Sequence, residues 1–363
     1  MTLRWSDYFL TSQFSAFWSK RLSEDGADVC LITGIGFDPR CRTALDQLLA
    51  VGRLEQISVL GFRFRTALDL LEPARELNQY GEANLQAILG TGVRNLGVGE
   101  IQLQDENRFT AGGPNAVRYV ASQIEALRTF RHVVVDISGM PRSVFYPTIS
   151  YLCNRADQGI VKNLHIVVSQ SAEIDTAIQL SEFGSADFIH TFRLTRKEKL
   201  VWLPVIGSRE RDRIVKIHNQ IKDDCIEICP ILPFPAKPLR KPDDVLIENS
   251  EVLFQELAIT PTNILLCDEA NPFDIYRKIV GLHDYYTGKL SALVGGVTTV
   301  ISPLSSKLLS LGALFAAIER KLPVSYVEAG LYNLAPAAMD VFRGVQIAPV
   351  EIWLTGEPYN GAE

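Results

Sequence analysis

The feature that most limits the fold is a regular alternation of short apolar runs and segments with helical periodicity. Residues 132–137 and 163–169 are continuous, β-branched runs, which are typical of strands buried on both faces of a sheet. Before them, residues 115–130 place Val117, Val120 and Ile124 on one face of a helix. Strands and helices in this alternation predict an α/β fold built on parallel sheets with right-handed crossovers.

The same reading gives a full set of expected elements. We expect strands at residues 28–33, 56–60, 100–103, 132–137, 163–169, 200–206, 225–231, 263–267, 298–302 and 323–327. We expect helices at residues 39–51, 65–90, 115–130, 141–156, 208–222, 245–257, 272–286 and 304–320.

The two halves of the chain repeat this order. Gly34 and Gly207, which follow the first strand of each half, are 173 residues apart, and Asp136 and Ile301, near the later strand ends, are 165 apart. Each half also ends in a strand-like segment, at residues 188–194 and 350–354. We therefore predict a tandem repeat of two Rossmann-like domains, residues 1–197 and 198–363, packed as an internal pseudo-dimer. The charged segment 195–199 is the expected connector.

Composition excludes several classes of protein. Of the 363 residues, 47% are hydrophobic and 21% are charged, so the chain is not disordered. A net charge of −6 and a pI near 5.5 argue against direct binding of duplex nucleic acid. The longest apolar stretch, residues 311–318, is too short for a membrane span, and the N-terminus does not resemble a secretory signal. Six scattered cysteines are typical of reduced thiols. We expect a cytoplasmic protein with no cofactor and no metal.

Two loops in the first half have the composition of a binding site. They are residues 34–40 and 136–142, and both follow a strand, contain glycine and open a helix with Pro-Arg. An arginine at a helix N-terminus is disfavoured by the helix dipole unless an anion binds there, and guanidinium and backbone N–H groups can both bind one. In such folds ligands bind beyond the carboxyl ends of the strands. The predicted ligand-binding residues are Gly34, Gly36, Asp38, Arg40, Asp136, Ser138, Gly139 and Arg142.

Purely structural roles explain the same residues. Asp38 is a favoured N-cap residue, Gly34 and Gly36 suit a tight turn, and Arg40 and Arg142 can reach carboxylates on neighbouring helices. The first loop is also not a full dinucleotide-binding fingerprint, because Pro39 stands where the third glycine belongs.

The second half contains weaker equivalents. Ser208 and Arg209 open a helix after Gly207, with Ser208 as the expected N-cap. Serine hydroxyls and a lysine at the next helix start could hold phosphate, or could be a cap and a solvated lysine. These residues are Ser302, Ser305, Ser306 and Lys307. The proline-rich loop 230–242 is a lid, a partner-binding edge or a connector.

Known catalytic motifs are absent from the sequence. It has no G-x-S-x-G elbow, no P-loop, no H-E-x-x-H and no C-x-x-C. His132 and His165 lie near strand starts, and we interpret them as structural. Glu173 and Asp136 are the candidates for acid–base catalysis, since both follow strands of the first half.

At this point a family resemblance emerges. Residues 136–142, Asp-Ile-Ser-Gly-Met-Pro-Arg, resemble the D-x-[S/T]-G-x-x-[K/R] loop of CARF (CRISPR-associated Rossmann fold) domains, and residues 308–327 are similar to the stretch that follows that loop. The sequence departs from the family at Met140 and Pro141, and the second-half loop lacks the aspartate and the glycine. CARF domains bind cyclic oligoadenylates at a dimer interface. The related SAVED domains join two CARF-like units in one chain.

The resemblance implies a regulator in prokaryotic antiviral defence. Such a protein senses a phosphate-bearing nucleotide and acts through a partner effector, because the two repeats use nearly the whole chain. Two alternatives stay open. One is a nucleotide-processing enzyme, a phosphodiesterase or an N-glycosyl hydrolase or transferase, that uses the same pocket. The other is a non-catalytic scaffold subunit.

Overall fold

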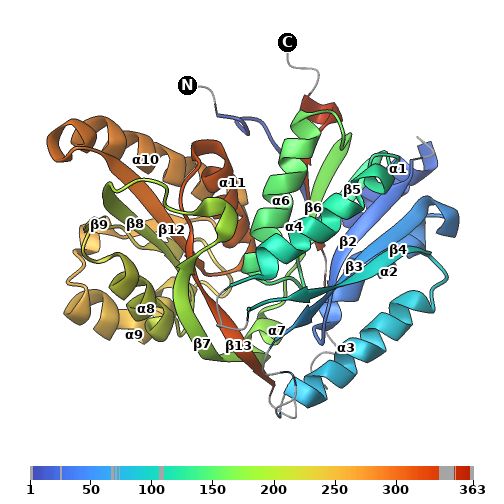
Figure 1. The fold of residues 1–363 in the computed structure, drawn as a ribbon, viewed down its shortest axis with the longest axis horizontal. Helices are drawn as coiled ribbons and strands as arrows, with labels where there is room; N and C mark the ends of the chain where they lie inside the picture. The colour runs from blue at the N-terminus through green and yellow to red at the C-terminus, as the bar shows by residue number, and fades with distance from the viewer. Residues whose placement is uncertain are drawn as a thin grey trace. The chain divides into compact units, whose positions relative to one another are not determined.

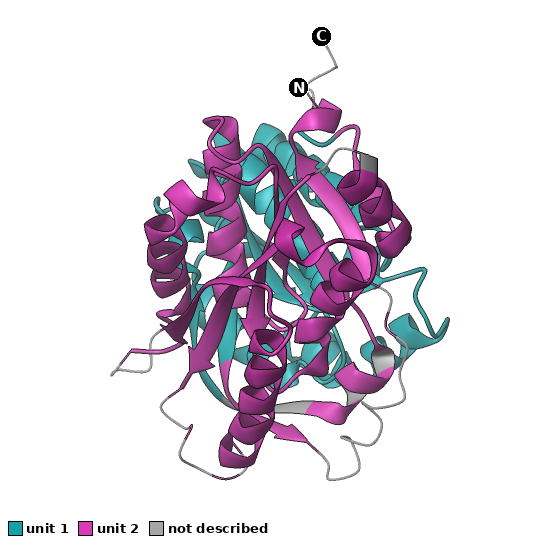
Figure 2. Cartoon of the chain, turned by 90° about the vertical axis from the view of Figure 1, so that its right-hand side faces the viewer, with its two compact units in different colours: residues 1–5, 183–328 teal, residues 6–182, 329–363 magenta. Residues whose placement is uncertain are grey.

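The computed structural model describes residues 3–24, 27–66, 69, 72, 74–105, 110–334, 347 and 349–359, without the side chains of residues 24, 172, 176, 179, 180 and 182. The chain forms two compact units, and neither is one continuous stretch (Figure 2). Unit 1 comprises residues 1–5 and 183–328, and unit 2 comprises residues 6–182 and 329–363. Strands β7 (Ile178–Phe188) and β13 (Ser325–Leu334), which pair with each other, carry the chain from one unit to the other.

Unit 2 contains the first part of the chain and the last strand (Figure 1). Its strands are β1 (Phe9–Thr11), β2 (Val29–Ile35), β3 (Ile57–Arg65), β4 (Arg94–Gln102), β5 (His132–Asp136), β6 (Asn163–Ser169) and β14 (Pro349–Thr355). Its helices are α1 (Phe14–Glu24), α2 (Thr43–Val51), α3 (Ala74–Leu89), α4 (Gly112–Ser122), α5 (Ile124–Leu127), α6 (Arg142–Asp157) and α7 (Ala172–Ala177), with short 3₁₀ turns η1 (Pro39–Arg42), η2 (Leu54–Gln56) and η6 (Glu357–Tyr359).

Unit 1 contains the middle of the chain. Its strands are β8 (Lys199–Ile206), β9 (Cys225–Ile228), β10 (Ile231–Pro233), β11 (Leu265–Cys267) and β12 (Val297–Leu304). Its helices are α8 (Arg211–Ile221), α9 (Lys241–Ser250), α10 (Pro272–Val294) and α11 (Lys307–Arg320), with 3₁₀ turns η3 (His190–Phe192) and η5 (Pro261–Asn263) and a π-helical segment η4 (Glu251–Glu256).

The sheet of unit 2 has the strand order β1-β14-β6-β5-β2-β3-β4. Strands β4, β3, β2, β5 and β6 run parallel, and β14 and then β1 add antiparallel strands at one edge. Numbered along the chain, the parallel strands have the order 3-2-1-4-5. These are five of the six positions in the order 3-2-1-4-5-6 found in doubly wound sheets, and the direction of the order reverses between β2 and β5.

The parallel sheet of unit 1 has the same order. Strand β12 pairs with β8 along its whole length, so β9 and β10, which pair with successive parts of β8, share its other edge. Strand β11 pairs with β10, and Val324 forms a parallel bridge with Ile301 of β12. If β9 and β10 are counted as one position and the bridge at Val324 as the fifth, the order is again 3-2-1-4-5, with the reversal between β8 and β12. The expected α/β class is confirmed, and both units carry the repeated strand order. The packing of the units as a pseudo-dimer stays a proposal.

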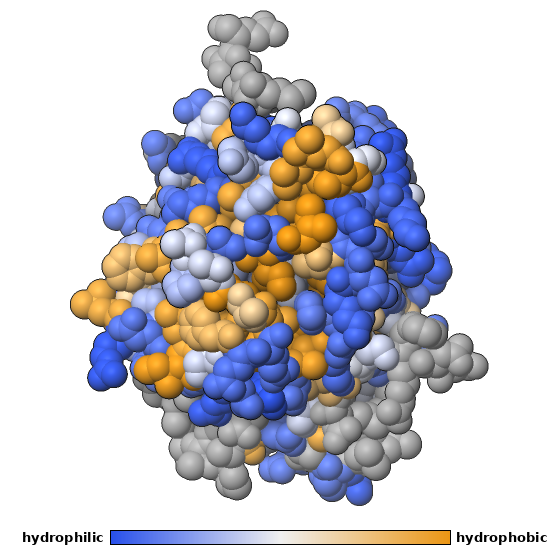
Figure 3. Space-filling model, turned by 90° about the vertical axis from the view of Figure 1, so that its left-hand side faces the viewer, coloured by the Kyte–Doolittle hydropathy of each residue, from blue (hydrophilic) through white to orange (hydrophobic). Residues whose placement is uncertain are grey.

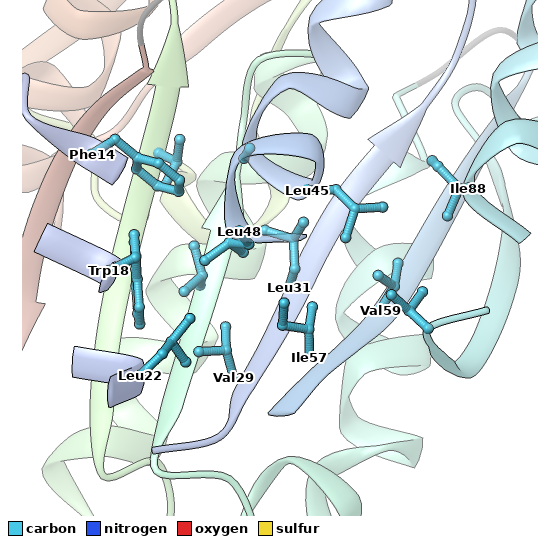
Figure 4. Close-up of a cluster of buried hydrophobic side chains, with 14 of the residues drawn as sticks. Phe14, Trp18, Leu22, Val29, Leu31, Leu45, Leu48, Ile57, Val59 and Ile88 are labelled. Atoms are coloured by element: carbon cyan, nitrogen blue, oxygen red, sulfur yellow. The ribbon is translucent and has the colours of Figure 1, made fainter. Parts of the chain in front are cut away.

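Apolar side chains on one face of the unit 2 sheet form a core with α1, α2 and α3. Phe14, Trp18 and Leu22 of α1 and Leu45 and Leu48 of α2 form this cluster with strand residues such as Leu31 of β2 and Ile57 of β3 (Figure 4). Cys30 and Ile32, which alternate with the inward residues of β2, are also fully buried. The sheet is thus covered on both faces, as its continuous apolar strands predicted.

Several expected elements differ from the structure. Residues 190–192 form a 3₁₀ turn, so the strand expected at 188–194 is wrong. Residues 350–354 do form a strand, but β14 pairs with β6 of unit 2 instead of closing the second half. The chain enters unit 1 at residue 183 and returns to unit 2 at residue 329, whereas the boundaries 1–197 and 198–363 treat each half as continuous.

Candidate functional site

The two predicted binding loops of unit 2 lie side by side. They leave adjacent parallel strands, since Thr33 of β2 is paired with Asp136 of β5. The backbones touch: a Cβ on Gly139 would lie 2.5 Å from the carbonyl oxygen of Gly34. Glycine at position 139 is therefore required by this close approach. The pair of loops stands where the strand order reverses, the position at which such sheets bind ligands.

Asp136 organises the second loop. One of its carboxylate oxygens accepts hydrogen bonds from the backbone N–H and the hydroxyl of Ser138. The Ser138 hydroxyl oxygen in turn accepts from the backbone N–H of Ser169, at the end of β6. All three residues are buried. These contacts join the ends of β5 and β6 and give Asp136 and Ser138 a structural role in this conformation.

Arg40 is buried between two carboxylates. Its Nε and Nη2 donate to Asp38 at 2.7–3.1 Å, and its Nη1 donates to Asp175 Oδ1 at 2.7 Å. The Arg40 side chain is 5% exposed, whereas that of Asp175 is 57% exposed. Asp38 also caps η1 by accepting the backbone N–H of Arg40 at 3.0 Å. The capping role of Asp38 and the carboxylate-pairing role of Arg40 are the ones that the structure contains.

The charges of Asp38, Arg40 and Asp175, which we call the unit 2 cluster, determine which ligands can bind there. Burial alone would lower the pKa of Arg40, but the charges and hydrogen bonds of Asp38 and Asp175 raise it above its ordinary value, so the guanidinium stays charged. One guanidinium and two carboxylates give a net charge of −1. An added anion is therefore disfavoured at Arg40 while Asp175 stays in place, and is favoured once Asp175 leaves.

The remaining residues of the two loops have these positions. Gly34 packs against Met140 and Phe64, so that a Cβ would lie 2.8–2.9 Å from their side chains. A Cβ on Gly36 would meet nothing within 4 Å, and the Gly36 carbonyl accepts a hydrogen bond from the Asn84 amide at 2.8 Å. Arg142 is the first residue of α6 and is half-buried.

Glu173 is an exposed residue of α7, two positions before Asp175 in the sequence. Its carboxylate accepts a hydrogen bond from the Ser171 hydroxyl at 2.9 Å, while Ser171 caps α7 by accepting the N–H of Ile174. Hydrogen bonds from the Glu173 backbone and from Ser171 lower the pKa of Glu173. A general acid needs the opposite shift, so this environment suits a capping residue.

In unit 1, the helix after β8 starts later than the sequence suggested. Helix α8 begins at Arg211 with Glu210 at the N-cap position, so the expected N-cap role of Ser208 is wrong. Ser208 and Arg209 form an exposed turn, in which Arg209 has φ 59° and its backbone N–H donates to Glu248. Gly207 repeats the close approach of unit 2, because a Cβ there would lie 2.7 Å from the Leu304 carbonyl oxygen.

A buried acid–arginine pair in unit 1 was missed by sequence reasoning. Nη2 of Arg213 donates to Glu210, and both side chains are about nine-tenths or more buried. Glu210 follows Asp38 by 172 residues and Arg213 follows Arg40 by 173, close to the 173-residue offset between Gly34 and Gly207. The 173-residue spacing between the two repeats could therefore have located this pair in the sequence. It was obscured because two residues lie between Glu210 and Arg213, whereas only one lies between Asp38 and Arg40.

The predicted serines at and after the end of β12 are either buried or cap a helix in unit 1. Ser302 is fully buried, and its hydroxyl accepts a hydrogen bond from the Trp202 indole at 2.9 Å, which gives it a structural role in this conformation. Ser306 caps α11 by accepting the N–H of Leu309 at 3.4 Å. Ser305 is buried before the cap, and Lys307 is the half-buried first residue of α11.

Two histidines that looked isolated in sequence form a buried chain with Glu351. His132 Nδ1 lies 2.9 Å from His165 Nε2, and His165 Nδ1 lies 2.7 Å from Glu351 Oε1. The Trp18 indole donates to the other oxygen of Glu351, and Trp353 stacks on His165. Burial raises the pKa of Glu351 far above its ordinary value. Burial, and then the His132 charge, lower the pKa of His165.

The proline-rich loop 230–242 is anchored to the neighbouring strand. The backbone N–H of Phe234 donates to the Cys267 carbonyl at 2.6 Å, and Lys241 pairs with Glu269. In the part of the chain that the structure describes, no three His, Cys, Asp or Glu side chains are arranged to hold a metal ion, and no helix is long and apolar enough to cross a membrane.

Comparison with known proteins adds little to this picture. No family model matches the chain, and no curated protein matches it. Among solved structures, the cytoplasmic domain of a prokaryotic cation chloride cotransporter is 14% identical, with 84% of this chain and 96% of that chain covered at a TM-score of 0.25. A putative universal stress protein from Pseudomonas aeruginosa UCBPP-PA14 is 11% identical, with 87% and 97% covered at a TM-score of 0.25. Likeness at this level carries no argument about function.

Proposed function

We propose that this chain is a regulatory protein that binds a phosphate-bearing nucleotide beyond the carboxyl ends of its parallel strands. The observation that carries the proposal is the repeated strand order 3-2-1-4-5, with a buried acid–arginine pair after the first strand of each unit. The pairs are Asp38–Arg40 and Glu210–Arg213. Two such pairs at the reversal points of two sheets match the place where this architecture binds nucleotides.

In unit 2, the ligand phosphate would take the position of the Asp175 carboxylate. Asp175 contacts Nη1 of Arg40 from the six-residue helix α7, and its side chain is 57% exposed, so the carboxylate can turn away while Ile174 of α7 stays in its core cluster. The remaining pair, Asp38 and Arg40, is neutral, and Arg142 at the start of α6 adds a positive charge on the adjacent loop. A cyclic oligonucleotide, as the CARF-like loop 136–142 suggests, presents several phosphates to such a surface.

The proposed regulator acts through a protein partner. Unit 1 carries several large apolar side chains that are exposed, and Figure 3 shows hydrophobic side chains gathered on a face of the molecule. On unit 1 these residues include Ile226, Phe234, Leu239, Ile247, Phe254 and Leu266. They support the partner part of the proposal. The antiviral setting rests on the sequence resemblance alone.

Calorimetric titration with cyclic di-, tri- and tetranucleotides tests the proposed function. We expect at least one of them to bind with a Kd below roughly 100 μM, equivalent to about −5.5 kcal/mol. Arg142→Ala should weaken that binding by about tenfold or more, because a charge-assisted contact to phosphate is lost. Arg128→Ala, an exposed arginine of unit 2 that precedes β5, is the control and should bind normally. Failure of every nucleotide to bind, or full binding by Arg142→Ala, would refute the proposal.

A further inference from the structure

The acid–arginine pair of unit 1 is less complete than that of unit 2. In unit 2, Nε, Nη1 and Nη2 of Arg40 all donate to carboxylates. In unit 1, only Nη2 of Arg213 does so, to Glu210. Nε and Nη1 of Arg213 are buried and have no hydrogen-bond acceptor among the residues that the structure describes. Arg213 thus lacks the second anion that Asp175 provides to Arg40.

The unfilled donors lie at the start of a long helix. Arg213 is the third residue of α8, which has 11 residues, and its guanidinium folds back to Glu210 at the N-cap position. The Glu210 side chain makes no capping hydrogen bond to the helix. Buried donors without acceptors destabilise a protein, and the N-terminal end of a helix attracts negative charge. Both effects favour an anion at this place.

We propose that Arg213 and the first turn of α8 bind a phosphate group, with Nε and Nη1 of Arg213 donating to its oxygens. The pair Glu210–Arg213 is neutral, whereas the cluster of Asp38, Arg40 and Asp175 has a net charge of −1, so unit 1 is the more receptive of the two sites. The inference deepens the proposed function, on which it rests, by assigning a phosphate subsite to unit 1.

The Phe183 side chain packs against the guanidinium of this subsite. The Arg213 guanidinium lies 5.3 Å from the centre of the Phe183 ring. Lys216, on the same face of α8, donates to the carbonyl oxygens of Phe183 and Gly184 at 2.6 and 3.0 Å, which fixes the backbone of β7 there. Because the backbone is held, we expect phosphate binding to need rotation of the Phe183 side chain and no movement of β7.

The test is calorimetric titration of the whole chain with inorganic phosphate and with pyrophosphate. Arg213→Gln should weaken binding by about tenfold or more, because two charge-assisted hydrogen bonds are lost. Glu210→Gln should tighten binding severalfold, because the competing carboxylate is removed while the guanidinium remains. Lys222→Gln is the matched control: it removes the same charge from the far end of the same helix, where Lys222 is the exposed C-cap residue.

The outcomes separate this inference from the proposed function. Loss in Arg213→Gln together with tightening in Glu210→Gln supports the subsite. Unchanged affinity in both, or no binding of either anion by the wild-type chain, means that Nε and Nη1 meet an internal water only, and overturns it. In that case nucleotide binding that is lost in Arg142→Ala would leave the proposed function intact. Should Arg213→Gln fail to fold, the direction of the Glu210→Gln change decides alone.

Discussion

At the scale of single residues, Arg40 is held by two carboxylates of very different exposure. Asp38 is nearly buried beside it, whereas the Asp175 side chain, 135 residues away in sequence, is 57% exposed. Removing one partner of a buried pair leaves an uncompensated charge, whereas removing an exposed partner leaves a solvated site. The Arg40 guanidinium therefore has a structural contact with Asp38 and an exchangeable contact with Asp175.

This difference predicts unequal losses of stability. Arg40→Gln should lower the free energy of unfolding by about 3–5 kcal/mol, because Asp38 stays buried without its partner. Asp175→Asn should lower it by less than about 1 kcal/mol. Urea denaturation of the two variants measures both values. Equal losses would show that Asp175 is as firmly built into the cluster as Asp38.

The buried pair Glu351–His165 predicts a pH dependence. In the unfolded chain Glu351 titrates near pH 4.5 and His165 near pH 6.5. In the folded chain the pKa of Glu351 is raised and that of His165 is lowered. The folded pair therefore holds one proton, on Glu351, throughout the range from pH 4.5 to 6.5 and beyond it. Between pH 4.5 and 6.5 the unfolded pair also holds one proton, and the pair adds no pH dependence. Above pH 6.5 the unfolded pair holds none, so stability falls as pH rises, by up to about 1.4 kcal/mol per pH unit.

Glu351→Gln removes the proton that the folded pair keeps. The fall above pH 6.5 should then disappear, because neither state of the variant binds a proton at this pair. Urea denaturation of the wild type and the variant between pH 6.5 and 8.5 measures the difference. If that difference does not change with pH, the pair does not carry the proton that its burial implies.

At the scale of elements, each sheet depends on one glycine at the end of a strand. Gly139→Ala and Gly207→Ala place a Cβ 2.5 and 2.7 Å from a carbonyl oxygen of the neighbouring strand end. Each should lower the free energy of unfolding by about 1–3 kcal/mol. Gly281→Ala, in the exposed middle of α10 with nothing within 4 Å, should instead stabilise by about 0.5–1 kcal/mol. Thermal denaturation measures all three, and a neutral Gly207→Ala would remove the parallel between the units.

The elements show how far sequence reasoning reaches. The strand at residues 163–169 was predicted with its exact bounds. A continuous apolar, β-branched run of this length indicates a strand that is buried on both faces of a sheet. Strand β8 forms despite Pro204, which stands where β9 ends and β10 begins along its edge. Helix α1 and strand β1 were missed, and the strand at 188–194 was wrong.

The candidate site was predicted in part. The two loops of unit 2 could be placed together because the carboxyl ends of parallel strands meet at one edge. The partners of Arg40 could not be chosen, since Asp175 is distant in sequence and its contact depends on where α7 begins. The same holds for Arg213, whose role depends on the start of α8 at residue 211.

At the scale of the whole molecule, the units are interleaved in sequence. Strand β14 crosses back from the end of the chain to complete the sheet of unit 2, where Trp353 and Glu351 pack on His165. Trp353→Ala should therefore destabilise unit 2, by about 3–5 kcal/mol. Amide hydrogen exchange should become faster in β5 and β6 and stay unchanged in β8 and β12. Faster exchange confined to β8 and β12 would instead mean that Trp353 supports the sheet of unit 1, as the continuous domain boundaries 1–197 and 198–363 require.

The central claim is that the carboxyl-end loops of unit 2 bind a phosphate-bearing nucleotide in the position that Asp175 now takes. Calorimetric titration of Asp175→Asn with a cyclic oligoadenylate tests it most directly. The control is Asp46→Asn, an exposed carboxylate paired with Arg42 in the same unit. We predict that Asp175→Asn binds about three- to tenfold more tightly than the wild type and that Asp46→Asn binds as the wild type does. Binding that is weaker in Asp175→Asn, or absent from all three proteins, would contradict the claim.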